Sequence, residues 1–342
     1  MRLKSFTLET DDIRLTQELT TGSGSVGDRS GLVLALRSAD GPVGRGATAP
    51  LPGAAQRLDD LAAEIERWAS AHVNHDIDEA VTTMPTDLTP AARFAIHTAL
   101  IDLQAQAAEA PLAQFLRVGS GMAVATNALV SSESAAEVYE RCRSAVDDGF
   151  SAVKLKVGFV EPGADATRII AASEACGSGT HLRLDANCSW ALDDAVHVIG
   201  RVGRHRVQYV EDPVADVGEY ASFTAETGVE AAVDVPPEWA NDLVARIESS
   251  SCRYVVMKPA AVGGVDRILG SAVALGDDVT TIVSSSIDGP IALAAAAHVA
   301  AAVPVPAAHG LATGPLVEGV PPELFPVHGS INLPTTSGVG DF

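Results

Sequence analysis

The chain has 342 residues, enough for one large domain and a smaller companion. Hydrophobic residues make up 47% of the chain and charged residues 20%, which is typical of a globular protein with a sizeable core and excludes a disordered or fibrous chain. The 44 acidic and 23 basic side chains give a formal net charge of -21, so we expect neither nucleic acid nor an anionic membrane as a partner.

The cysteines and the apolar runs indicate neither a secreted nor a membrane protein. Cys142, Cys176, Cys188 and Cys252 are well separated and form no C-x-x-C pair, so neither a zinc site nor a disulfide framework is indicated. We interpret them as small buried side chains in a reducing compartment. The N-terminus lacks the apolar core of a signal peptide, and the alanine-rich run 291–305 is too short to span a bilayer. We therefore expect a cytoplasmic protein.

The first part of the chain predicts a mixed α+β domain. The apolar run 31–36 follows the glycine- and serine-rich cluster 21–27, which indicates an antiparallel sheet with a flexible loop. From Leu58 to Trp68 the apolar residues recur every three or four positions, which predicts a helix. Thr89-Pro90 then supplies an N-cap and a first helical residue for a second helix. We expect this N-terminal domain to span residues 1–95.

From about Met122 onward, short apolar runs alternate with helix-length segments. Their spacing of roughly 20–30 residues and their number, about eight, predict a parallel (β/α) barrel of the TIM type over residues 96–315. No G-x-G-x-x-G follows the first run, so an open doubly wound sheet with a dinucleotide site is not favoured. Residues 316–342 are expected to pack back toward the N-terminal domain. The predicted strands are 123–130, 152–157, 182–184, 207–210, 230–235, 254–257, 281–283 and 305–308.

Acidic residues end three consecutive predicted strands. Asp185, Glu211 and Asp234 would meet at the carboxyl end of the barrel, where catalytic groups of this fold lie. Taken singly, each acid could simply cap a loop. Together they would repel one another unless a cation lay between them, and an all-oxygen ligand set with open positions favours Mg²⁺.

Lysines flank these acids on the neighbouring strands. Lys154 and Lys156 are two residues apart on one strand, so both face the barrel interior. Lys258 ends a strand across the barrel. A desolvated lysine can act as a general base, and two lysines facing a metal-held substrate form a site for removing a proton next to a carboxylate.

These motifs resemble those of a known family. The chain is similar to the enolase superfamily in its muconate lactonizing branch and, within that branch, to the o-succinylbenzoate synthases. The resemblance covers nearly the whole chain. The residues that carry it are Lys154-x-Lys156, Leu182-Arg-Leu-Asp-Ala-Asn187 with Trp190, Glu211-Asp-Pro213, Lys258-Pro259, Ser284-Ser-Ser-Ile-Asp288 and Ala49-Pro-Leu-Pro-Gly53.

The resemblance implies a modified enolase-like barrel with an N-terminal capping domain. It also implies Mg²⁺-dependent dehydration of 2-succinyl-6-hydroxy-2,4-cyclohexadiene-1-carboxylate, a small carboxylate of menaquinone biosynthesis. In that reaction the base removes the proton α to the carboxylate and returns it to the departing hydroxyl. The implied roles are metal ligation by Asp185, Glu211 and Asp234, general base for Lys156, enediolate stabilisation by Lys258, and substrate contacts from Lys154, Asn187, Ser284 and Gly310.

Two segments depart from the family pattern. The family usually places Glu and often Ser after its third metal ligand, whereas Asp234 is followed by Val235-Pro236-Pro237. Since neighbouring groups orient metal ligands, this change affects the expected metal affinity at Asp234. The family also commonly shows Gly-Glu shortly before its Pro-Leu-Pro-Gly stretch, where this chain has Gly44-Arg45-Gly46.

Other functions remain open at this stage. An N-succinylamino acid racemase or a muconate cycloisomerase would share the machinery, while a dipeptide epimerase would be expected to carry Asp-x-Asp where this chain reads Ala307-Ala308-His309-Gly310-Leu311. A Schiff-base aldolase using Lys258 leaves the three acids unexplained, and a non-catalytic descendant would have lost the metal. His309 could contact a substrate or serve as a hydrogen-bonded packing histidine. Arg29 could pair with a substrate carboxylate, but we favour a solvated loop arginine, and we count neither residue as catalytic. The oligomeric state cannot be read from the sequence.

Overall fold

The computed structural model describes residues 1–16, 19–21, 24–50 and 56–342. Residues 51–53 of the motif Ala49-Pro-Leu-Pro-Gly53 lie outside the described residues. Short strands β2 (Leu19–Thr21) and β3 (Gly24–Val26), in the predicted loop region, pair antiparallel.

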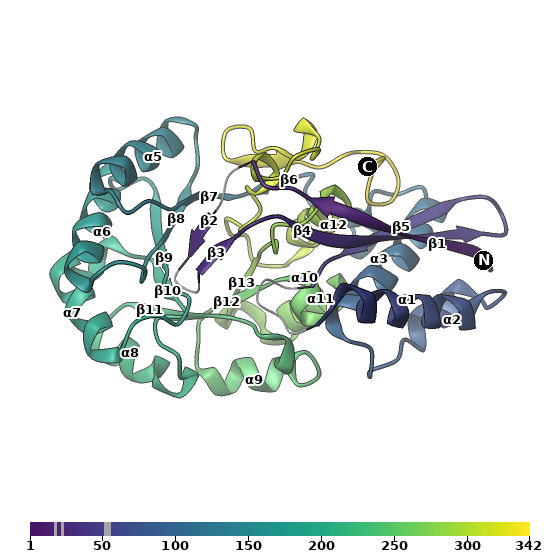
Figure 1. Ribbon diagram of the computed structural model, residues 1–342, viewed down its shortest axis with the longest axis horizontal. Coiled ribbons are helices and arrows are strands. Elements are labelled where there is room, and N and C mark those ends of the chain that lie inside the picture. Colours follow the sequence, from purple (N-terminus) through teal and green to yellow (C-terminus); the bar gives the residue numbers. More distant parts are fainter. Residues whose placement is uncertain (17–18, 22–23, 51–55) are drawn as a thin grey trace.

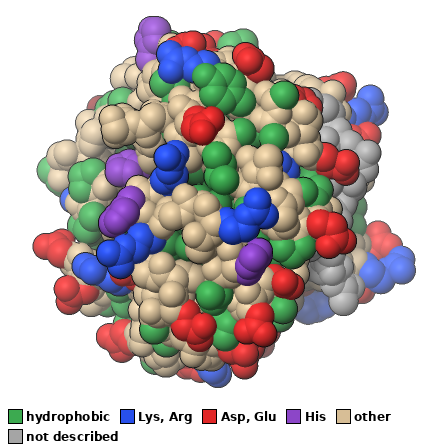
Figure 2. All heavy atoms as spheres, turned by 90° about the vertical axis from the view of Figure 1, so that its left-hand side faces the viewer, with side chains coloured by type: hydrophobic (Ala, Val, Ile, Leu, Met, Phe, Trp, Pro, Cys, Tyr) green, Lys and Arg blue, Asp and Glu red, His purple; other side chains and the backbone are tan. Residues whose placement is uncertain are grey.

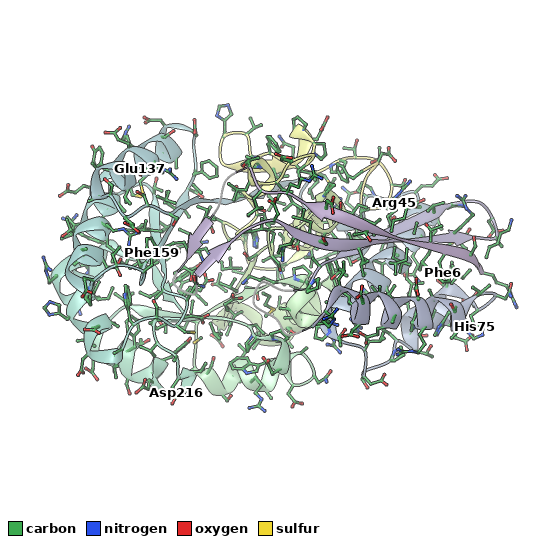
Figure 3. The ribbon with its side chains drawn as sticks, in the orientation of Figure 1. Phe6, Arg45, His75, Glu137, Phe159 and Asp216 are labelled. Carbon is green, nitrogen blue, oxygen red and sulfur yellow. The ribbon has the colours of Figure 1, made fainter. Side chains whose placement is uncertain are left out.

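The N-terminal part forms an antiparallel sheet in the order β1-β4-β5, with helices packed on it (Figure 1). The predicted strand 31–36 lies within β4, and the two predicted helices are α1 and α3, so these predictions are confirmed. Figure 3 labels Phe6 on β1 and Arg45 on β5 in this part of the molecule. The bounds are β1 Leu3–Ile13, β4 Arg29–Ser38, β5 Val43–Thr48, α1 Leu58–His72, α2 Ile77–Thr82 and α3 Pro90–Ala107.

Helix α3 is the central element of this part, because it is buried on nearly all sides. It packs against β5 on one side and against the barrel segment α10 (Pro259–Val262) on another. Pro90 is its first residue, as expected, but the Thr89 side chain makes no capping bond; instead the N–H and the hydroxyl of Thr89 both donate to the Glu64 carboxylate, the N–H at 2.7 Å. The helix runs unbroken across position 95, so the domain boundary there stays a prediction.

The close packing of β5 on α3 depends on two glycines. A Cβ atom on Gly46 would lie 1.9 Å from the carbonyl oxygen of Ala95, and one on Gly44 would lie 2.1 Å from that of Ala99. No real Cβ makes such a contact with backbone. The Gly44-Arg45-Gly46 segment therefore sets how closely this sheet approaches the helix.

Strands β7 to β13 form a curled parallel sheet in the order β13-β12-β11-β10-β9-β8-β7. Helices on its outside connect successive strands (Figure 1). The strand bounds are β7 Asn127–Val130, β8 Ala152–Lys156, β9 His181–Asp185, β10 Tyr209–Glu211, β11 Glu230–Asp234, β12 Tyr254–Met257 and β13 Thr280–Val283. The further helices are α4 Leu112–Leu116, α5 Ala135–Asp147, α6 Pro162–Cys176, α7 Leu192–Val202, α8 Tyr220–Thr227, α9 Leu243–Ser250, α11 Val265–Leu275 and α12 Pro290–Ala302.

Two strand predictions are corrected. The predicted strand 123–130 is two elements, because β6 (Ala123–Ala125) leaves the barrel sheet and pairs antiparallel with β14 (Ser330–Asn332). Residues 305–308, all described, form no strand, since Pro304 and Pro306 lack the N–H groups that a ladder requires. The ring is closed instead by bridges at His309 and Gly310, which pair with Thr126 and Ser284.

The last residues lie against helix α3 and the start of α4. Val339 N–H donates to Asp102 of α3 at 2.9 Å, and Leu112 N–H donates to the Gly338 carbonyl at 2.8 Å. The packing of residues 316–342 back toward residues 1–95 stays a prediction, as do the domain bounds.

The barrel end of the molecule has a surface with charges of both signs. Figure 2 shows the end of the molecule covered by the barrel helices, where acidic and basic side chains are interspersed. None of the helices in the described part of the chain is long and apolar enough to cross a membrane.

The four cysteines are free, and three of them are buried. Cys188 is exposed because it lies in the loop after β9, so the interpretation of the cysteines as buried side chains is wrong for this residue.

We expect Gly46→Ala to destabilise the protein by about 1–3 kcal/mol or more, since the added methyl group must push α3 away from β5. Thermal and urea denaturation measure the loss. Gly200→Ala on α7 is the matched control, because nothing lies within 4 Å of its added Cβ, and its stability should stay the same or rise slightly. Equal stability of the two variants would contradict this account of the packing.

Candidate active site

Charged side chains gather at the carboxyl ends of strands β8 to β12. Lys156 lies opposite Asp185 in the pairing of β8 with β9, and Asp185 lies opposite Glu211 in the pairing of β9 with β10. Asp234 ends β11, and Lys258 directly follows β12. Strand register therefore brings the predicted residues to one level of the barrel.

Each carboxylate in this group is matched by a lysine. The Lys156 ammonium lies 2.7 Å from Asp185 Oδ2, and the Lys154 ammonium lies 2.9 Å from the same oxygen and 3.1 Å from Glu211 Oε1. Lys258 contacts the carboxylate of Asp234. Because the three positive and three negative charges are paired, this buried site avoids isolated charges, which would be very unfavourable.

The pairing determines how the groups titrate. Burial raises the pKa of Glu211 to about 7, and the neighbouring charge of Asp185 adds to the effect. Burial alone would raise the pKa of Asp185 as well, but Lys154 and Lys156 hold it well below its usual range. Burial would lower the pKa of Lys258, yet the carboxylate of Asp234 raises it above normal. In this arrangement Asp185 is an anion and Lys258 a cation at neutral pH.

A cavity of about 350 Å³ opens onto this group. Eight of the nine residues that the sequence predicted for the site line this cavity. The ninth, Glu211, contacts Lys154 but does not line the cavity. Their individual roles stay predictions. The lining residues are Asn127, Leu129, Lys154, Lys156, Asp185, Asn187, Asp234, Val235, Pro236, Pro237, Lys258, Ala261, Ser284, Ser285, Ser286, Ile287, Gly310, Ala312 and Thr313.

The acids fit a hard divalent cation by their chemistry. All three offer carboxylate oxygens, and Asp185 and Glu211 already share one positive charge, the Lys154 ammonium. As they stand, the described residues contain no group of three His, Cys, Asp or Glu side chains that could hold a metal ion. The acids are spread among the lysines, so a bound cation would have to replace some of these contacts.

Asp234 is supported by a residue that the sequence analysis did not single out. Oδ1 of Asp212 accepts from the Asp234 N–H at 3.0 Å and from the Tyr220 hydroxyl at 2.9 Å. Asp212 is the middle residue of Glu211-Asp-Pro213 and has a left-handed backbone, with φ 44°. The motif was therefore the signal that could have identified it. In the altered segment after Asp234, Val235, Pro236 and Pro237 line the cavity.

Arg29 is not the solvated loop arginine that we expected, because its side chain is only 12% exposed. It reaches from β4 to the wall of the cavity and donates to the carbonyl oxygens of Ser286 at 2.6 Å and Ile287 at 2.5 Å. The carboxylate of Asp288 lies 3.6 Å away. Ile287 has φ 59°, which is strained for a β-branched residue, so Arg29 holds a strained segment in place.

The interpretation of His309 as a packing residue is confirmed. Its Nδ1 accepts from the Val283 N–H at 3.0 Å, and its ring is buried. Burial lowers the pKa of His309 to about 3, so the ring is neutral and supports the closure of the barrel.

Comparison with known proteins decides the family. Residues 7–117 match the model of the mandelate racemase/muconate lactonizing enzyme N-terminal domain, and residues 137–341 match the enolase C-terminal domain-like model. The chain belongs to the enolase superfamily. The predicted family and the barrel with its capping domain are thus confirmed, and the family is one of enzymes.

Two curated relatives differ in activity. The o-succinylbenzoate synthase of Thermobifida fusca is 34% identical over 196 residues, which are 56% of this chain and 61% of that enzyme, so the match covers less than two thirds of its length. The hydrophobic dipeptide epimerase of Enterococcus faecalis is 26% identical over 363 residues, and that match covers 99% of both chains.

Solved structures share the fold over its full length. The dipeptide epimerase of Enterococcus faecalis, complexed with Mg and the dipeptide L-Leu-L-Tyr, has a TM-score of 0.87 at 24% identity, and the match covers 99% of each chain. The N-succinyl Arg/Lys racemase of Bacillus cereus has a TM-score of 0.88 at 18% identity, and the match covers 99% of this chain and 95% of that one. At these identities the likeness shows the fold alone.

We expect Arg29→Met to lower the free energy of unfolding by about 3 kcal/mol, because it leaves Asp288 buried without its positive partner. The double variant Arg29→Met/Asp288→Asn should recover a substantial part of this loss, since no unpaired charge remains. Urea denaturation of the two single variants and the double variant measures the coupling. Strictly additive effects would show that the two side chains do not interact.

Proposed function

We propose that this chain is a Mg²⁺-dependent o-succinylbenzoate synthase, a lyase of menaquinone biosynthesis that dehydrates 2-succinyl-6-hydroxy-2,4-cyclohexadiene-1-carboxylate. The observation that carries the proposal is that Lys156 and Lys258 line one cavity, each held by a carboxylate at the end of a neighbouring strand. Strands β8 and β12 are four steps apart in the sheet order, about half-way round the closed ring. The two lysines therefore approach a substrate from different sides.

Asp185, Glu211 and Asp234 are the residues that would hold Mg²⁺. When bound, the ion would stabilise negative charge that develops on the substrate carboxylate. The chain's own part is to hold these acids in place, and Asp212 contributes by accepting from the backbone N–H of Asp234.

Lys156 is the proposed base. In its neutral form it removes the proton α to the substrate carboxylate, and the C–H electron pair moves into the enediolate. Lys258, as the ammonium, stabilises that negative charge from across the cavity. Lys156 then returns its proton to the departing hydroxyl, water leaves and the ring becomes aromatic. Asn187 orients the base, because its Oδ1 lies 2.9 Å from the Lys156 ammonium.

The cavity favours a dicarboxylate over a substrate with a free amine. Of the described residues that line it, the acidic ones are Asp185 and Asp234, and both already contact lysines. The segment around Gly310 offers no acid, whereas Ser284, Ser285 and Thr313 supply hydroxyl groups. An ammonium group would find no free carboxylate there, but the oxygens of a succinyl arm would find hydrogen-bond donors.

The second candidate is racemisation or epimerisation at the carbon next to a carboxylate. The full-length match to the hydrophobic dipeptide epimerase of Enterococcus faecalis favours it. Two lysines on different sides of one cavity would suffice to remove a proton from one face and add it to the other. Racemisation of an N-succinylamino acid fits this cavity better than epimerisation of a dipeptide. The described lining residues offer no carboxylate that is free of a lysine contact and could bind the amine of a dipeptide.

We expect the protein with Mg²⁺ to dehydrate the cyclohexadiene acid in a direct ultraviolet assay. Lys156→Ala should lower kcat by about 10²–10⁴-fold, because the general base is lost, while circular dichroism shows an unchanged fold. Lys4→Ala is the control, since this exposed lysine lies on β1, and it should keep full activity. Near-normal turnover by Lys156→Ala would show that Lys156 is not the general base. Fast racemisation of an N-succinylamino acid without dehydration would make the second candidate the better one.

We expect Mg²⁺ to raise the melting temperature and a chelator to reverse the change. At a concentration 100 times the dissociation constant the stabilisation should be about 2.7 kcal/mol. Asp185→Asn should abolish the Mg²⁺ response, whereas Asp216→Asn should keep it, because Asp216 lies on the outer side of the barrel (Figure 3). Differential scanning calorimetry measures both. A wild-type melting temperature that does not change with Mg²⁺ would indicate a non-catalytic descendant of the family.

A further inference from the structure

A second buried group of charges lies outside the cavity, at the start of helix α6. Asp165 and Arg168 form an ion pair one turn apart, and their side chains are 0% and 1% exposed. Burial raises the pKa of Asp165 and lowers the pKa of Arg168, so burial opposes both charges. A pair kept under such a penalty contributes little net stability compared with apolar side chains of the same size. The role of this pair must therefore be sought in the groups that its two side chains contact.

The Arg168 guanidinium connects the ends of two barrel strands. Its Nε donates to the Ser132 carbonyl at 2.7 Å, just after β7, and its Nη2 donates to the Lys156 carbonyl at 2.7 Å, at the end of β8. Nη1 donates to Asp165. The ring of Phe159, whose centroid lies 4.4 Å from the guanidinium carbon, covers the group (Figure 3 labels this residue). Arg168 thus holds the main chain of the proposed base.

Asp165 connects the same region to the next strand. Its Oδ2 accepts from the Gly158 N–H at 2.8 Å, two residues after Lys156, and from the Trp190 indole N–H at 3.0 Å. Trp190 lies in the loop after β9, which also carries Asn187. One ion pair therefore ties the segments that follow β7, β8 and β9.

We propose that Asp165 and Arg168 are positioning residues, which act by holding the end of β8 and the loops beside it so that Lys156 meets the substrate at the correct place. The proposal rests on the proposed role of Lys156. Its side chain is oriented inside the barrel by Asp185 and Asn187, while Arg168 orients its carbonyl from outside. With both ends held, the position of the base is determined from two directions. A displacement of about 1 Å at a reacting group can cost about 10²-fold in rate.

The test compares Arg168→Met and the double variant Asp165→Asn/Arg168→Met with wild type. The double variant removes both charges, so it keeps the test valid if the single variant does not fold. We expect kcat to fall about 10–100-fold with KM within twofold of wild type, because the base moves while the substrate contacts stay. The matched control is Asp102→Asn, a buried carboxylate that accepts two backbone N–H groups far from the base. It should lose stability but keep kcat.

A second measurement does not depend on activity. Amide hydrogen exchange should become at least tenfold faster in residues 131–134, 157–160 and 186–191 of the Arg168 variants and should not change there in Asp102→Asn. A normal kcat in the variants, with an active wild-type enzyme, would overturn the proposal and leave the pair a merely structural one. If the wild type catalyses none of the candidate reactions, the proposed function fails. Faster exchange confined to these segments would then support only the inference that the pair holds the end of β8 and the loops beside it, and unchanged exchange would overturn that inference too.

Discussion

The mutual neutralisation of lysines and carboxylates at the mouth of the barrel is the interaction on which the site depends. A buried carboxylate or ammonium is tolerated only with a partner, so Asp185, Glu211 and Lys154 must be placed together or not at all. The parallel ladder places them, because register aligns Lys156, Asp185 and Glu211 across three strands. The barrel is therefore both the scaffold of these charges and the reason that they can be buried.

Contacts outside the cavity keep this arrangement rigid. Arg29 crosses from the first domain to the strained wall at Ile287, and the glycines of β5 let the sheet lie closely on α3. On the other side, Arg168 holds the main chain at the end of β8. Each of these groups acts on a backbone atom rather than on a substrate. The shape of the cavity thus depends on residues that never line it.

The elements with a strong local pattern were predictable. The apolar run of residues 31–36 and the helical spacing from Leu58 to Trp68 depend only on neighbours in the chain, so both predictions hold. The predicted strand at 305–308 was wrong because Pro304 and Pro306 lack the N–H groups that a ladder requires, although the run is apolar. The predicted strand 123–130 forms two elements because its two halves pair with different strands. Its first half, β6, pairs with β14, and the paired residues Ala125 and Ser330 are about 200 residues apart in the chain.

By itself the sequence determined which charged residues end the strands and in what order, because a strand repeats every two residues and a parallel barrel brings strand ends to one face. It therefore identified Lys156, Asp185, Glu211, Asp234 and Lys258 as one group. Only the tertiary structure decided which lysine meets which carboxylate, that Arg29 is buried against Ser286, and that Asp165 and Arg168 hold three loops. Such pairings join atoms far apart in the chain, so no local pattern encodes them.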